Sequence, residues 1–194
     1  MKKTLSTVLM LAIAMTSFAQ KNKKAAEKPE GYQFTVVKEN PITPVKNQAS
    51  SGTCWSYSTI SFLESEAIKK GAPADIDLAE MDPGWNGYSD KAVKFVRLDG
   101  KLNYEQVSSV GDVIYTLGHY GMVPQKEMEG LNYGEPMNKH GELVGVLKGY
   151  VNAVLKNPNR KLSTAWLKGL NGILDAYLGE CPEKFVVDGK EYTP

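Results

Sequence analysis

A polar, glycine-containing loop runs directly into a helical pattern at Cys54, and this junction constrains the fold more than any other stretch of the chain. The loop begins near Pro44 and contains Gly52. Apolar residues then follow at positions compatible with a helix that ends near Gly71: Ile60, Phe62, Leu63 and Ala67. Cys54 is therefore expected at the N-terminus of a helix.

Cys54 and Gln48 have the residue types and the spacing of a nucleophile and an oxyanion-binding amide. The free N–H groups and the positive dipole end of a first helical turn stabilise a thiolate, which is the nucleophilic form of cysteine. Gln48 lies upstream on the loop, so its amide can fold back and face, with the Cys54 N–H, a carbonyl oxygen under attack. The alternative is a buried structural cysteine, because free cysteine is among the most buried residue types.

The run from Gln48 through Ser51-Gly52-Thr53-Cys54-Trp55 resembles the nucleophile motif of papain-like cysteine peptidases. Ser51 stands where many members have a cysteine, and Thr53 replaces a smaller residue; both changes are tolerated in the bleomycin hydrolase and aminopeptidase C branch, which the sequence resembles more closely. The resemblance implies a papain-like α+β fold, of which this chain is mainly the helical half. It also implies peptide substrates, with Cys54 as nucleophile and Gln48 in the oxyanion hole.

The same resemblance leaves the type of peptidase open. The bleomycin hydrolase branch implies amino-terminal trimming of peptides by a homo-oligomer, whereas exported papain relatives can be endopeptidases. Val107 and Ser108 stand where the family usually carries a pair of glycines in the cleft wall. A valine side chain would project where only backbone is normally accommodated, so substrate binding is expected to depart from the family pattern there.

The N-terminus has the pattern of a signal peptide over residues 1–19. Lys2 and Lys3 precede a largely apolar run that ends in a small residue, Ala19. The run is shorter than the ~20 residues that a membrane-spanning helix needs, so we expect export to the periplasm or medium and no membrane span. Residues 20–30 are rich in lysine and predict a linker. Residues 31–194 are assigned to the peptidase domain, which is expected to be incomplete at its C-terminus.

Charge and cysteine content exclude several functions. The 194 residues include 23 basic and 22 acidic side chains, which gives no electrostatic argument for nucleic acid or an anionic membrane. In an exported protein, Cys54 and Cys181 can form a disulfide, although the motif needs a free thiol. They lie too far apart in sequence for a short metal-ligand or redox spacing, so no metal or cofactor is expected.

Several further elements follow from periodicity and turn signals. Alternating apolar residues predict an edge strand over 32–37. The turn-dense run 82–87 predicts either a loop insertion or a lost helical turn, before helices over 88–98 and 112–120. Two amphipathic stretches, 141–157 and 162–178, predict an antiparallel helical hairpin. It resembles an insertion of the bleomycin hydrolase branch, with core packing or an oligomer contact as the general alternative. A short hairpin is expected over 185–192.

The base and the orienting asparagine of a cysteine peptidase are not found in this chain. The chain has two histidines, His119 and His140, and both are interpreted as surface or helix-end residues, because neither has a family motif around it. We therefore hypothesise that the chain is the N-terminal part of a longer aminopeptidase-like enzyme and that this chain alone is inactive. The alternative is a catalytically inactive exported binding or scaffold protein derived from the papain-like fold.

Overall fold

The computed structural model describes residues 31–194, and the chain divides into two units, Met1–Glu39 and Asn40–Pro194. The predicted signal peptide and linker, residues 1–30, lie outside the described residues. Within the first unit, the edge strand predicted over 32–37 is wrong. The backbone there joins no sheet, and Tyr32 and Phe34 are 93% and 90% exposed. Alternation alone does not make a strand when no neighbouring strand buries its apolar side.

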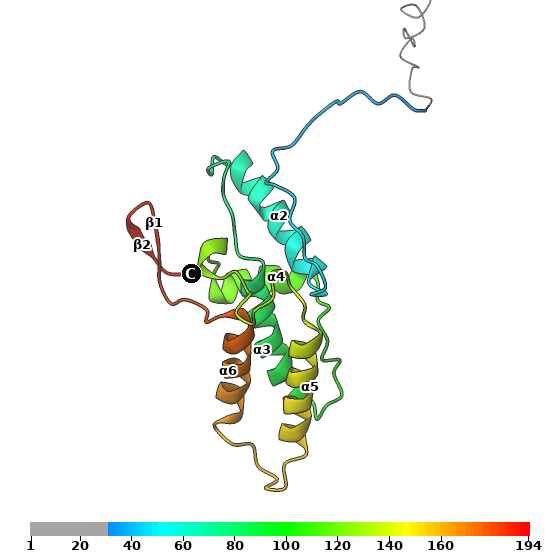
Figure 1. Ribbon diagram of the computed structural model, residues 1–194, viewed down its shortest axis with the longest axis vertical. Coiled ribbons are helices and arrows are strands. Elements are labelled where there is room, and N and C mark those ends of the chain that lie inside the picture. Colours follow the sequence, from blue (N-terminus) through cyan, green and yellow to red (C-terminus); the bar gives the residue numbers. More distant parts are fainter. Residues whose placement is uncertain (1–30) are drawn as a thin grey trace, which may run out of the picture. The chain divides into compact units, whose positions relative to one another are not determined.

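The second unit is mainly helical with one small sheet (Figure 1). Its elements, in chain order, are α2 (Cys54–Lys69), α3 (Met81–Arg97), α4 (Val110–Tyr120), the 3-10 helix η1 (Gln125–Glu127), α5 (Gly141–Leu155), α6 (Trp166–Leu178), β1 (Phe185–Val187) and β2 (Lys190–Tyr192). No helix within residues 31–194 is long and apolar enough to cross a membrane.

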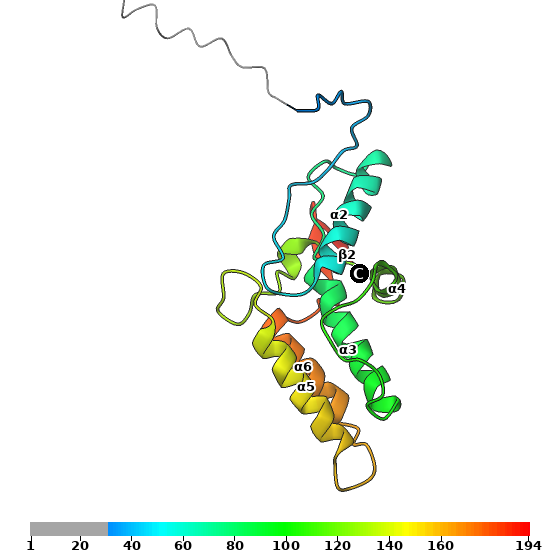
Figure 2. The ribbon, with the colours of Figure 1, turned by 90° about the vertical axis from the view of Figure 1, so that its right-hand side faces the viewer.

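The main core lies between α3, α5 and α6. The helices α5 and α6 run side by side as the predicted antiparallel hairpin, and α3 packs against both of them (Figures 1 and 2). The apolar residues recur every three or four positions, so one stripe of each helix faces the others. The buried members are Met81, Tyr88, Ala92, Val96, Leu143, Leu147, Val151, Leu170, Leu174 and Leu178. Packing against the core is therefore confirmed; that the hairpin is a family insertion stays a prediction.

A smaller cluster joins α2 to α4 and thereby fixes the helix that carries the cysteine. Trp55 and Ile60 from α2 and Val113 from α4 are its buried residues. The helix α4 begins with a capping box between Ser109 and Asp112, in agreement with the helix predicted there.

The helix α3 begins earlier than the sequence predicts. The run 82–87 was expected to form a loop insertion or to mark a lost turn, and both expectations are wrong, because it forms the first turns of α3. Pro83 is tolerated because the first turn of a helix needs no N–H donor. Gly87 lies against the indole of Trp55, where a Cβ would sit at ordinary van der Waals distance, 3.5 Å from the ring. Burial thus overrides the turn signal.

The short hairpin β1–β2 is confirmed over the predicted residues. Phe185 pairs with Tyr192 in an antiparallel register. Asp188 and Gly189 form the two-residue turn with φ of 51° and 75°, the left-handed pair that favours a tight hairpin.

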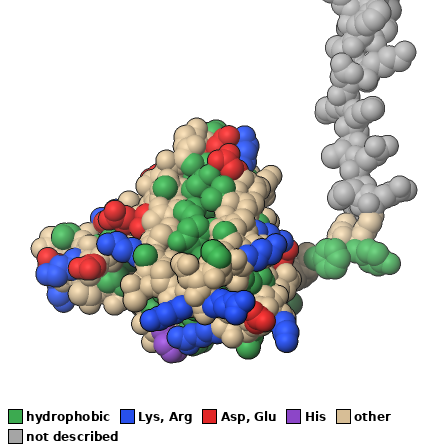
Figure 3. All heavy atoms as spheres, turned by 90° about the horizontal axis from the view of Figure 1, so that it is seen from below, with side chains coloured by type: hydrophobic (Ala, Val, Ile, Leu, Met, Phe, Trp, Pro, Cys, Tyr) green, Lys and Arg blue, Asp and Glu red, His purple; other side chains and the backbone are tan. Residues whose placement is uncertain are grey.

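The described surface carries both signs of charge, and Figure 3 shows basic and acidic side chains on the same face.

Candidate active site

Cys54 is the first residue of α2, as the sequence predicts. Its side chain is exposed, so the alternative of a buried structural cysteine is wrong. Thr53 precedes the helix, and its carbonyl accepts the first N–H bond of the helix, from Ser56, at 2.9 Å. Among residues 31–194 no side chain caps this helix end. The thiol therefore stands, open to solvent, where the N–H groups of a helix point.

The loop before Cys54 is held by its own polar side chains. The Asn47 carboxamide oxygen accepts the Ala49 N–H at 2.9 Å, and the Ser51 hydroxyl donates to the Gln48 carbonyl at 2.8 Å. The hydroxyls of Ser51 and Thr53 also hydrogen-bond to each other, and both residues are fully buried. Ser51, which stands where papain relatives often have cysteine, thus organises the loop through its hydroxyl group.

Gln48 lies on this loop with a half-buried side chain. Its Oε1 is buried and has no hydrogen-bond partner among the described residues. No hydrogen bond joins Gln48 to Cys54 within residues 31–194. Its assignment to the oxyanion hole therefore remains a prediction.

The segment around Gln106 packs against the nucleophile loop. Gly52 has φ of +63°, and a Cβ there would meet the Gln106 Oε1 at 2.8 Å. The indole N–H of Trp55 donates to the Gln106 carbonyl at 3.0 Å, and Lys91 donates to the Val107 carbonyl at 2.6 Å. Val107 is 70% exposed. Its side chain thus projects to solvent, and the expected departure of substrate binding from the family pattern stays a prediction.

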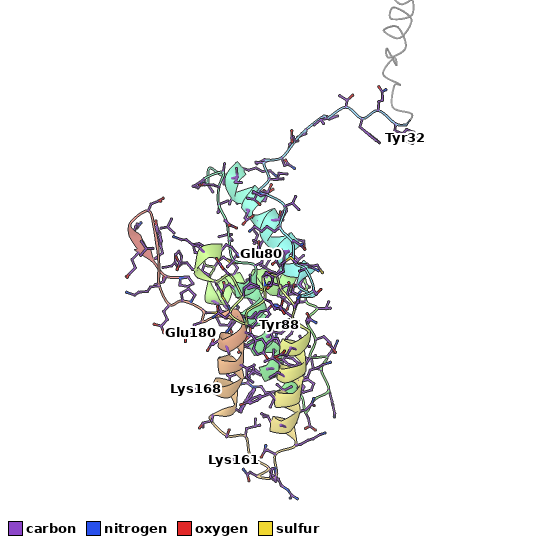
Figure 4. All side chains as sticks on the ribbon, in the orientation of Figure 1. Tyr32, Glu80, Tyr88, Lys161, Lys168 and Glu180 are labelled. Atoms are coloured by element: carbon purple, nitrogen blue, oxygen red, sulfur yellow. The ribbon has the colours of Figure 1, made fainter. Side chains whose placement is uncertain are left out.

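A partly buried ion cluster ties the start of the same loop to α2 and α3. The ammonium group of Lys46 lies 3.3 Å from Glu64, 2.6 Å from Asp77 and 2.5 Å from Glu80. Glu64 is fully buried, and Glu80 lies close to α2 at the start of α3 (Figure 4). Sequence reasoning missed this cluster. The available signal was the position of Glu64, four residues after Ile60 on the buried face of α2.

Burial and pairing act in opposite directions within this cluster. Burial lowers the pKa of Lys46, but its bonds to Asp77 and Glu80 outweigh burial and hold the pKa above its usual value. Burial raises the pKa of Glu80, and the attraction of Lys46 reduces that rise. Three carboxylates gathered within 4.8 Å resemble a metal site, but the Lys46 ammonium group already lies among them.

Neither histidine contacts the thiol. His119 is exposed near the end of α4 and stacks on Tyr115 with ring centroids 3.9 Å apart. His140 directly precedes α5, so its interpretation as a helix-end residue is confirmed. It is fully buried, so its interpretation as a surface residue is wrong. Its Nδ1 lies 3.4 Å from the Tyr88 hydroxyl, and burial lowers its pKa to about 4. Within residues 31–194 no imidazole hydrogen-bonds to Cys54.

Cys181 is a free thiol, as is Cys54, so the disulfide considered between them does not form. The Cys181 thiol instead contacts the Asp82 carboxylate at 3.8 Å and the Met128 sulfur at 3.9 Å. Burial raises the pKa of Asp82 to about 6, against the lowering effect of hydrogen bonds from Cys181 and Asn86. Cys181 is thus a partly buried thiol that packs against the first turn of α3.

The chain is similar to known proteins over the part that contains the nucleophile loop. The family model for papain family cysteine proteases matches residues 29–83, the part that contains the nucleophile loop and α2. A cysteine proteinase of Trypanosoma brucei brucei is 30% identical over 117 residues, which covers 53% of this chain and 24% of that protein. The chain thus spans about a quarter of the length of that relative. The chain is therefore similar to papain family cysteine proteases over its nucleophile loop and α2, and its mainly helical structure with one small sheet fits an α+β fold of that kind.

Proposed function

We propose that this chain carries the nucleophile of an exported papain-like cysteine peptidase that trims peptides from their amino termini. The observation that carries the proposal is the exposed Cys54 as the first residue of α2, directly after a loop fixed by internal hydrogen bonds. The family match over residues 29–83 supports this reading of the cysteine.

The proposed reaction has two halves. The Cys54 thiolate attacks the peptide carbonyl carbon, and the side-chain amide of Gln48 and the Cys54 N–H stabilise the oxyanion. The amine then leaves with a proton from an imidazolium group, so that a thioester to Cys54 remains. The imidazole then takes a proton from a water molecule as the water oxygen adds to the thioester carbon. Collapse of the resulting tetrahedral intermediate releases the acid and the free cysteine.

The histidine in this scheme is proposed to come from polypeptide outside residues 31–194. Within these residues both imidazoles are engaged elsewhere, His119 on Tyr115 and His140 near Tyr88. The chain alone is therefore proposed to be inactive. The same observation favours the second candidate function, an exported binding or scaffold protein that keeps the fold without catalysis.

One experiment separates the two functions. The protein is isolated from its own source, its intact mass is measured, and it is assayed on peptides with free and with blocked amino termini. The peptidase proposal expects a mass well above that of residues 20–194 and cleavage of free amino termini, which is lost in Cys54→Ala. A mass equal to residues 20–194 together with no cleavage would favour the binding protein. Cleavage of blocked peptides alone would indicate an endopeptidase.

A further inference from the structure

Asn138 lies beside the nucleophile loop, although it is far from it in sequence. Its backbone carbonyl accepts the Ser50 N–H at 2.9 Å, and the His140 N–H donates to the Ser50 carbonyl at 3.3 Å. Ser50 and Lys139 therefore form a parallel β-bridge. The residues that lead into α5 thus run along the loop that precedes Cys54.

The side chain of Asn138 makes a second link, to the helix α2. Its Nδ2 donates to the Tyr57 hydroxyl at 2.8 Å, across 81 residues of sequence. Asn138 is only 5% exposed, so little water competes for this bond. Burial raises the pKa of Tyr57 to about 12, although the Asn138 bond lowers it, so the hydroxyl stays protonated at neutral pH. Tyr57 is in the first turn of α2, which begins at Cys54.

Asn138 therefore contacts both sides of Cys54, through Ser50 before it and through Tyr57 after it. The hydrogen bonds of Asn47 and Ser51 join loop residues to each other, whereas those of Asn138 join the loop to α2. Gln48 lies on the loop side of this link. A change at Asn138 is expected to let the loop and the helix move relative to each other.

We infer that Asn138 is a positioning residue that fixes Gln48 relative to Cys54. The inference rests on the proposed function, because this geometry matters only if both groups act on one carbonyl. Oxyanion stabilisation requires donors placed to within tenths of an ångström. A misplacement of about 1 Å can cost roughly a hundredfold in rate.

The first test measures the link itself, by amide hydrogen exchange in the protein as it is exported and in its variants. Asn138→Ala and Tyr57→Phe each delete the same side-chain bond, and each is expected to speed exchange of the Ser50 amide about tenfold, the equivalent of one hydrogen bond. Lys139→Ala is the matched control, because within residues 31–194 its side chain pairs only with the half-exposed Glu135, and it is expected to leave exchange unchanged. Unchanged exchange in Asn138→Ala would overturn the inference.

The second test measures turnover in the complete enzyme. Asn138→Ala and Tyr57→Phe are expected to lower kcat about tenfold to a hundredfold with little change in KM, and the double variant is expected to be no worse than the poorer single variant. A lower unfolding midpoint with kcat unchanged would show a purely structural role and overturn the inference. If the unsubstituted enzyme cleaves no peptide, the proposed function fails and the positioning role fails with it, whereas the exchange result still decides whether the link exists.

Discussion

The indole N–H of Trp55 donates to the backbone carbonyl of Gln106 at 3.0 Å. This bond joins the first turn of α2 to the segment that connects α3 to α4. Because Gly52 also lies against the Gln106 side chain, the loop, the helix start and the Gln106 segment form one packed unit. Changes at any of the three are expected to affect the surroundings of Cys54.

Gly52→Ala is expected to destabilise the protein by about 1–2 kcal/mol from its left-handed backbone alone. Contact with Gln106 adds to this, since the new Cβ would lie 2.8 Å from Oε1. Urea denaturation of the single variants and of Gly52→Ala/Gln106→Ala forms a double-mutant cycle. The second substitution should recover the part of the loss that comes from the Gln106 carboxamide, and should leave the backbone part together with the contact to the Gln106 Cβ, 3.0 Å away, which alanine keeps. Full recovery in the double variant would contradict a role for the positive φ.

Lys46→Met is expected to cost about 3 kcal/mol in the free energy of unfolding, because it leaves buried carboxylates without a counter-charge. Glu64 is fully buried and Glu80 is 2% exposed, so neither can recover full hydration. Lys69→Met is the matched control, since Lys69 pairs with Glu66 at the surface of α2, and it should change stability by less than about 1 kcal/mol. Equal effects of the two substitutions in urea denaturation would refute this account of the cluster.

Asp82 is expected to make stability depend on pH. Burial raises its pKa from 3.8 to about 6, so the folded state holds this proton more tightly than the unfolded state. Its contribution is fully present below pH 3.8 and is lost as the pH rises through 6. Asp82→Asn should therefore stabilise the protein at pH 7.5, by up to roughly 3 kcal/mol, and should give no gain near pH 3.5.

The control for this prediction is Asp75→Asn, at an exposed carboxylate. It should alter stability little at either pH. Thermal or urea unfolding of both variants across this range provides the measurement. A gain for Asp82→Asn that is the same at both pH values would argue against titration of Asp82 as the cause.

Gln48→Ala is expected to lower kcat of the complete enzyme about a hundredfold or more, as loss of one oxyanion donor does in other hydrolases. KM should change little, because the donor acts mainly in the transition state. Ser58→Ala, at an exposed position of α2, serves as the control and should keep full activity. Turnover of Gln48→Ala equal to that of the control would remove Gln48 from the mechanism.

Periodicity predicted the helices well, because each buries one stripe of its own residues. The hairpin α5–α6 and the N-terminus of α2 at Cys54 were found in this way. The start of α3 was not, since Pro83, Gly84 and Gly87 signal a turn locally, and the burial of this run becomes visible only in the folded structure. The prediction of an edge strand over 32–37 was wrong for the opposite reason. The local pattern favours a strand, but the described structure offers no partner strand for it.

The candidate site was only partly predictable, because its supporting contacts cross long stretches of sequence. Cys54 and Gln48 are recognisable from a local motif, whereas Asn138 carries no local sign that it contacts Tyr57. The burial of His140 is equally hidden, since a polar neighbourhood precedes α5. The residues that hold the loop in place could therefore be identified only from the three-dimensional structure.

The most direct test of the account is to find which residue a peptide-like electrophile modifies. The protein from its own source is treated with a peptidyl chloromethyl ketone, its residual activity is followed, and the modified residue is identified by peptide mapping. We predict one label, on Cys54, with activity lost in proportion to labelling, and no label on Cys181. Loss of activity with the label elsewhere, or full labelling of Cys54 with activity retained, would contradict Cys54 as the nucleophile.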